Sequence, residues 1–249
     1  MGTMNYVRNR YIPAAFSSAA LLLAGCSAAD EPADDSTAAE SKASDVVDTH
    51  ADDRDRAVRI IADASSTEQV LWAYIYRAVL GDEGRDAEVM LDDGADIAKR
   101  WDMLQTRQTD FLITCTGKFV AEFNPSIAQG LVADGDAPDP NEADVHEQFH
   151  REVMGLLPPT IVTTAPSSAQ GCTDSDTSLP QDFTPLFGAG LFNREEIGEI
   201  QKVTRLLDDR NLEELEDKLA DGLTAEEAAG QWAAVNVTGS SPDSVSDDS

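Results

Sequence analysis

The fold is decided by one stretch of the chain, Val58-Arg-Ile-Ile-Ala-Asp-Ala-Ser-Ser-Thr-Glu-Gln-Val-Leu-Trp-Ala-Tyr-Ile-Tyr76. Its β-branched start, residues 58–62, predicts a strand. Apolar residues then recur every four positions, which predicts a helix from Gln69 to about Leu80. Ser65 followed by Glu68 is a capping-box pattern, so we expect the helix to start directly after the strand.

The same alternation continues along the chain. Residues 87–91 read as a second strand and 96–108 as a second helix. Residues 109–115 read as a third strand, followed by a helical segment that reaches Phe123. Strands and helices that alternate at this spacing imply right-handed βαβ units. The expected fold class is therefore α/β, with a mainly parallel sheet flanked by helices.

The second half of the chain is mostly helical. Residues 141–157 predict a helix and 160–164 a strand. A further strand is expected at 183–187, and Pro185 places it at an edge of the sheet because proline cannot donate to a central ladder. Helical patterns with capping signals fill the remainder.

The N-terminus has the layout of a secretory signal. Arg8 and Arg10 precede an uncharged run, Tyr11–Ala24, which is too short for a comfortable membrane span. The run ends in Leu-Ala-Gly-Cys26, which matches the lipobox of bacterial lipoproteins. We therefore expect a signal peptide over 1–25, lipid on Cys26, and attachment to the extracytoplasmic face of a cell membrane. A soluble signal with a chance cysteine is the alternative.

The composition is strongly acidic. The chain has 47 Asp and Glu residues against 18 Lys and Arg, a formal net charge of -29. This charge argues against nucleic acid and anionic lipid as partners. Segments 26–56 and 238–249 are too polar and too charged to form a core, so we expect a tether and a tail around a folded body at 57–237.

Two cysteines remain in the body, Cys115 and Cys172. Cysteines outside the cytoplasm are more often paired than free. We therefore predict a disulfide between them, with two buried thiols as the alternative.

The order of motifs resembles the glycine-betaine/choline-type substrate-binding proteins of osmoprotectant ABC transporters. The similarity is carried by Thr67-Glu-Gln with Ile75-Tyr, by Asp110-Phe-Leu-Ile-Thr-Cys-Thr-Gly117, and by Leu179-Pro-Gln-Asp-Phe-Thr-Pro-Leu-Phe187. The resemblance implies a type II periplasmic-binding-protein fold. It also implies capture of a quaternary amine or amino acid for a membrane permease, without catalysis and without a cofactor.

The chain departs from that family at one place. Family members have a second lobe built from a long central insertion, whereas only a short polar stretch lies between Thr164 and Pro185. The chain therefore resembles the first lobe alone. The leading function is solute binding for, or derived from, an importer of the glycine betaine, choline or proline type. The alternative is a non-transporting interaction lipoprotein built on the truncated lobe.

The candidate ligand contacts lie at the helix starts that follow the first and third strands, and on the first helix. Hydroxyls and free backbone N–H groups at these starts can bind an anionic group, and aromatic rings can bind a quaternary amine. Helix capping and core packing are the competing interpretations. The candidates are Ser65, Ser66, Thr67, Thr116, Gly117, Trp72 and Tyr76.

His146-Glu-Gln-Phe-His150 matches the H-E-x-x-H pattern, which would place both histidines on one helix face. A zinc peptidase is therefore a third hypothesis. Charged neighbours favour an exposed helix instead, and the body has no other histidine. A third ligand would have to be Glu195 or Glu196, so the expected metal is none.

Overall fold

The computed structural model describes residues 56–93, 96–133, 143–172 and 179–239. The predictions for the signal peptide, for Cys26 and for nearly all of the tether and tail lie outside these residues. No helix in the described ranges is long and apolar enough to cross a membrane.

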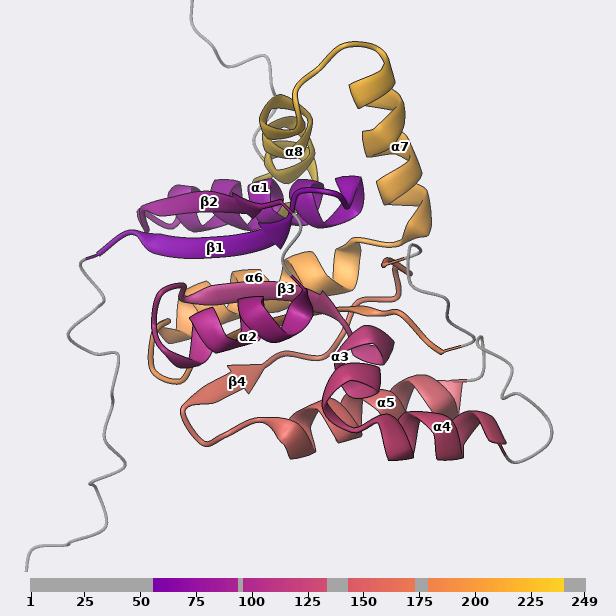
Figure 1. Ribbon diagram of the computed structural model, residues 1–249. Coiled ribbons are helices and arrows are strands. Elements are labelled where there is room, and N and C mark those ends of the chain that lie inside the picture. Colours follow the sequence, from indigo (N-terminus) through magenta and orange to yellow (C-terminus); the bar gives the residue numbers. More distant parts are fainter. Residues whose placement is uncertain (1–55, 94–95, 134–142, 173–178, 240–249) are drawn as a thin grey trace, which may run out of the picture. The chain divides into compact units, whose positions relative to one another are not determined.

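One five-stranded sheet forms the centre of the body, in the order β2-β1-β3-β5-β4. β1 pairs in parallel with β2 and β3, whereas β5 runs antiparallel to both β3 and β4. Four strands therefore point one way and β5 the other (Figure 1). The strands are β1 Val58–Asp63, β2 Ala87–Asp92, β3 Phe111–Cys115, β4 Ile161–Thr163 and β5 Phe183–Gly188.

Helices cover both faces of this sheet. In Figure 1, α2 lies in front of β3 while α1 and α6 lie behind the sheet. The predicted α/β fold class is confirmed. The helices are α1 Thr67–Asp82, α2 Ile97–Gln105, α3 Thr116–Phe123, α4 Pro125–Ala133, α5 Ala143–Leu156, α6 Arg194–Leu206, α7 Asp209–Ala220 and α8 Ala225–Ala233, followed by the π-helix η2 Ala234–Thr238.

Alternation along the strands divides the core into two clusters. Ile60 of β1 belongs to the cluster covered by α1, α6, α7 and α8, whereas its neighbour Ile61 belongs to the cluster of α2, α3, α4 and α5. In β3, Phe111 and Leu112 divide in the same way. Successive side chains of a strand point to opposite faces, so each strand contributes to both layers.

The structure corrects the position predicted for β5. This strand is central and not at an edge, because β4 pairs on its far side. Pro185 is tolerated because β4 ends at Thr163, which pairs with Leu186. The carbonyl of Pro185 faces that side and accepts a hydrogen bond from Thr163 Oγ1 at 2.7 Å. The missing N–H of the proline therefore falls where the neighbouring strand has ended.

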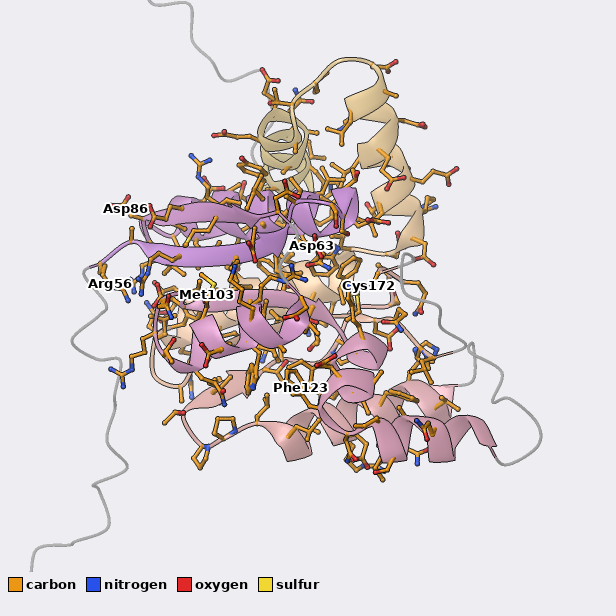
Figure 2. The ribbon with its side chains drawn as sticks, viewed as in Figure 1. Arg56, Asp63, Asp86, Met103, Phe123 and Cys172 are labelled. Atoms are coloured by element: carbon orange, nitrogen blue, oxygen red, sulfur yellow. A yellow bond between two sulfur atoms is a disulfide. The ribbon has the colours of Figure 1, made fainter. Side chains whose placement is uncertain are left out.

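The first described residues are tied to the sheet by an ion-pair cluster. Arg56 binds Asp110 with two nitrogens, at 2.7 and 2.8 Å, and Arg59 Nε adds a contact at 2.9 Å. Burial opposes ionisation of Asp110, but the hydrogen bonds from both arginines lower its pKa to about 2. This cluster secures the start of β1 to the start of β3. Figure 2 labels Arg56 just before β1.

Candidate functional site

The carboxyl ends of β1 and β3 lie on one edge of the sheet, which we call the strand-end edge. β1 ends at Asp63 and leads into α1, and β3 ends at Cys115 and leads into α3. β5 begins at the same edge, with Phe183 opposite Cys115. In sheets of this kind ligands bind beyond the carboxyl ends of the parallel strands, so this is where the fold places a site.

The start of α1 is capped by its own residues. Ser66 is the N-cap and accepts a hydrogen bond from Gln69 N at 3.2 Å, while its hydroxyl donates to Glu68 at 2.7 Å. Ser65 instead donates its N–H and its hydroxyl to Asp63 Oδ1, at 3.0 and 2.5 Å. The predicted pairing of Ser65 with Glu68 is therefore wrong by one residue. Both serine hydroxyls are engaged by the protein itself.

Asp63 is the charged centre of this end of the edge (Figure 2). Arg100 donates to its carboxylate at 2.9 Å, and the two side chains are buried together. Burial opposes ionisation, but hydrogen bonds from Ser65 and the charges of Arg100 and Lys118 hold the pKa of Asp63 below its ordinary value. Asp63 is therefore ionised, and Arg100 already neutralises its charge. Thr67, the remaining hydroxyl of the predicted set, is the first residue of α1 and is exposed.

The start of α3 is closed by a distant segment of the chain. Thr116 N donates to the carbonyl of Asp182 at 2.9 Å, and Gly117 N donates to the carbonyl of Pro180 at 2.9 Å. Thr116 Oγ1 reaches the same Pro180 carbonyl at 3.1 Å. The groups predicted to receive an anionic ligand therefore bind carbonyls of the protein.

The fit around Gly117 is close enough to require glycine. A Cβ atom there would lie 2.4 Å from Pro180 O and 2.6 Å from Gln181 Nε2. Gln181 also accepts a hydrogen bond from Lys118 N at 3.0 Å through its Oε1. The chain thus fills the helix start with its own residues, and a solute would have to displace them.

The segment that does this is the connector between β4 and β5, residues 164–182. It turns back along the start of β5, where Ser167 N donates to Phe183 O at 2.9 Å and Gly171 N donates to Gln181 O at 2.8 Å. Residues 173–178 of the connector lie outside the described ranges.

The predicted disulfide between Cys115 and Cys172 is present and ties the connector to the end of β3. Gln69 links both to β1, because its Nε2 donates to Cys172 Sγ at 3.4 Å and its Oε1 accepts from Asp63 N at 3.3 Å. Figure 2 labels Asp63 and Cys172 at this junction. β1, α1, β3 and the connector are therefore joined at one point of the strand-end edge.

The aromatic contacts predicted for a quaternary amine are wrong for Trp72 and Tyr76. Both side chains are fully buried. The Trp72 ring packs 5.0 Å from Phe183 and 5.6 Å from Tyr76, measured between centroids. Tyr76 Oη hydrogen bonds Thr204 Oγ1 at 2.8 Å. At helical spacing these rings form the core under the edge and present no face to a solute.

An open pocket of about 610 Å³ lies beside the closed region, between α5, the connector and the start of α7. We call it the α5 pocket. Ala165 and Pro166 give it an apolar wall. Its polar lining includes His146, Glu147, His150, Gln170, Asp182 and Asp209.

Asp182 organises this pocket. Its Oδ2 lies 2.6 Å from His146 Nδ1, and its Oδ1 accepts a hydrogen bond from Gln170 Nε2. The carboxylate is nearly inaccessible to solvent. Burial and the charge of Asp209 raise the pKa of Asp182, more than His146 and Gln170 lower it. An acid and two histidines thus share one pocket.

The described residues around the two histidines offer no complete set of zinc ligands. His146 Nδ1 is turned to Asp182. In the described ranges no group of three or more His, Cys, Asp or Glu side chains is arranged to hold a metal ion. His150 Nδ1 is buried without a hydrogen-bond partner in the structure. Burial lowers the pKa of His150 despite the nearby charge of Asp182, so this ring is neutral at pH 7.

No protein-family model and no curated protein matches the sequence. The fold resembles apo YehZ from Escherichia coli, with a TM-score of 0.54 at 12% identity over 72% of this chain and 98% of YehZ.

The likeness to YehZ concerns the fold alone. Two further structures align over 72% of the chain. Lactococcal OpuAC complexed with glycine betaine has 10% identity, 95% of its chain covered and a TM-score of 0.41. A TRAP periplasmic solute binding protein from Pseudomonas putida F1 with bound D-glucuronate has 10% identity, 91% of its chain covered and a TM-score of 0.42.

The sequence did not point to three residues of the pocket, Gln170, Asp182 and Asp209. A signal for Asp182 is present in its position: it directly precedes β5. An antiparallel return strand begins at the edge where parallel strands end, so a polar residue before it belongs to the site. No sequence signal indicates Gln170 or Asp209, because the contact between them depends on how the connector folds.

Proposed function

We propose that this protein is a lipid-anchored, extracytoplasmic solute-binding protein of, or derived from, an osmoprotectant ABC importer. It holds its solute without covalent chemistry. The observation that carries the proposal is the α5 pocket, about 610 Å³ in volume, at the strand-end edge of a binding-protein fold. A pocket of this size suits a small molecule.

The lipid anchor rests on the sequence alone. Arg8 and Arg10, the uncharged run after them and the Leu-Ala-Gly-Cys26 motif support cleavage before Cys26 and acylation of its thiol. Mass spectrometry of the membrane fraction tests this, because Cys26 should carry acyl chains. The Cys26→Ala variant should leave the membrane. Equal membrane retention of the two proteins would contradict the anchor.

The solute class is drawn from the resemblance and from the charge of the pocket. The family takes zwitterionic and cationic amines, and the polar lining of the α5 pocket contains more acidic than basic residues. The membrane partner is then an ABC permease.

One observation favours a second candidate, a non-transporting interaction lipoprotein. Two-lobed binding proteins close around solute at the connection between lobes. Here that place is taken by the connector, which Cys115 and Cys172 fasten to β3. A lobe without this hinge cannot signal occupancy by closing, so such a protein would act through its surface.

Thermal melting of the Cys26→Ala full-length chain separates the two candidates. The panel is glycine betaine, choline, carnitine, proline and zinc, with sodium chloride at matched osmolarity as the control. A solute present at a hundred times its dissociation constant stabilises the fold by about 2.7 kcal/mol. A shift with one amine supports solute binding. No shift with any organic solute would favour the interaction lipoprotein.

A further inference from the structure

We propose that the α5 pocket selects an organic cation that carries at least one ammonium N–H, and that the exposed carboxylate of Asp209 binds this group beside the buried Asp182. The expected solutes are protonated primary, secondary and tertiary amines, including amino acids such as proline. The inference rests on the proposed solute-binding function and names the chemical class of its solute.

The first argument is charge. Among the residues that the structure describes, no lysine or arginine lines the pocket, whereas Glu147, Asp182 and Asp209 do. Glu147 is already paired with Arg151 at 2.8 Å. Asp182 and Asp209 remain, and they are close enough for the charge of Asp209 to raise the pKa of Asp182. A cation at Asp209 would relieve that repulsion.

The second argument is the way Gln170 holds the two acids. Its backbone N–H donates to Asp209 Oδ1 at 2.7 Å, and its side-chain Nε2 donates to Asp182 Oδ1. One residue therefore fixes both carboxylates, although they belong to distant parts of the chain. Carboxylate oxygens can accept more than one hydrogen bond, so the exposed Asp209 can still receive an N–H donor, whereas Asp182 is nearly inaccessible.

The third argument concerns the kind of cation. Recognition of a quaternary ammonium relies on the faces of Trp, Tyr or Phe, and none of these lines the α5 pocket among the described residues. A metal ion needs a group of ligands that the described ranges do not arrange. A hydrogen-bonding ammonium is the cation that fits fixed carboxylates beside an apolar wall such as Ala165 and Pro166.

The histidines complete the set of acceptors. His150 Nδ1 is buried at the pocket without a hydrogen-bond partner, and a neutral imidazole nitrogen can accept an N–H. His146 is held by Asp182 at 2.6 Å. Glu147 and Asp209 are the other titratable groups that line the pocket. A neutral His150 adds an acceptor and no opposing charge.

The test is calorimetric titration of the Cys26→Ala chain with a methylation series: choline, N,N-dimethylethanolamine, N-methylethanolamine and ethanolamine. Glycine betaine and proline provide a zwitterionic pair. We expect the affinity to rise at least tenfold from choline to N,N-dimethylethanolamine, where the first N–H replaces a methyl group. The Asp209→Asn variant should lose at least tenfold of that affinity. Glu213→Gln, which removes the same charge from the exposed side of α7, should not.

The outcomes separate the two proposals. Binding of choline or glycine betaine as tight as that of the N–H amines would overturn the selectivity and leave solute binding intact. N–H selectivity that survives Asp209→Asn would overturn the assignment to the α5 pocket. Failure of every amine to bind would overturn solute binding itself. Melting curves of Asp209→Asn and Glu213→Gln establish that both variants are folded.

Discussion

The strand-end edge has a closed part and an open part, and the same connector forms both. At the start of α3, backbone carbonyls of the connector occupy the helix N–H groups. Beside α5, side chains of the connector line a pocket of about 610 Å³. Asp182 belongs to both parts, because its carbonyl binds Thr116 N while its carboxylate faces His146.

The difference shows that the path of one short connector decides which part of the strand-end edge is open. Binding proteins place ligands at the carboxyl ends of their parallel strands. In this chain the end of β3 is covered by backbone carbonyls of the connector. The open pocket lies beside α5 instead. The path of the connector, and not the fold alone, therefore determines where an open pocket lies.

The largest effect is expected when the connector is released from β3. Replacing both Cys115 and Cys172 by serine removes a crosslink across 57 residues of sequence. We expect the free energy of unfolding to fall by about 4 kcal/mol, because the unfolded chain regains the entropy of that loop. Urea denaturation measures the loss, and hydrogen exchange at Thr116 and Gly117 should quicken. A loss below about 1 kcal/mol would mean that the disulfide does not hold the closed part together.

A smaller change tests the fit inside the closed part. Gly117→Ala places a methyl group 2.4 Å from Pro180 O, so we expect a loss of about 2 kcal/mol from overpacking. Gly198→Ala on α6 is the matched control, since nothing lies within 4 Å of its Cβ position. That control should gain up to about 1 kcal/mol from helix propensity. Equal stability of the two variants would show that the connector can move away from α3.

The buried rings sharpen the distinction between core and site. Tyr76→Phe removes the hydrogen bond to Thr204, so we expect a loss of about 1 kcal/mol in unfolding free energy and no change in solute affinity. Tyr74→Phe, at a half-exposed position on the same helix, should change neither. A weaker solute affinity in Tyr76→Phe would return this ring to the site.

The smallest expected effect belongs to the open part. Burial lowers the pKa of His150 in the fold, so the unfolded chain binds more protons once the pH falls below about 6.5. The stability contribution of His150 is therefore complete above that pH and is lost as the pH falls. Asp182 acts in the opposite sense, because its raised pKa favours proton uptake by the folded state.

Denaturation of wild type and His150→Gln between pH 7.5 and 5 isolates the effect of His150. The variant should be less sensitive to pH over this range. Loss of the ion pairs at Asp110 does not interfere, since it begins only below about pH 4. Identical pH profiles would mean that His150 is as solvated in the fold as in the unfolded chain.

The sequence predicted what depends on local periodicity. Apolar residues at every second or every fourth position indicate strands and helices. These patterns predicted the alternation from β1 to α3, the helix α5 and the helices of the C-terminal part. The disulfide followed from compartment and from the number of cysteines. The helix α4 was not predicted, although Pro125 at its first position is a helix-start signal.

What the sequence could not predict depends on contacts between distant segments. The central position of β5 depends on where β4 ends, and no local pattern encodes this. The α5 pocket joins residues from α5, the connector and α7, so its members share no spacing. Trp72 and Tyr76 were assigned to the ligand because aromatic residues suit an amine, yet burial decides such a role and sequence does not show burial.

The association of α1 with α8 sets the order in which this chain can fold. Trp72 and Trp232 belong to the same buried cluster, although 160 positions separate them. A nascent chain therefore cannot cover the apolar side of α1 until its final helices have emerged from the ribosome. A product cut before α8 would leave that side of α1 exposed to proteases.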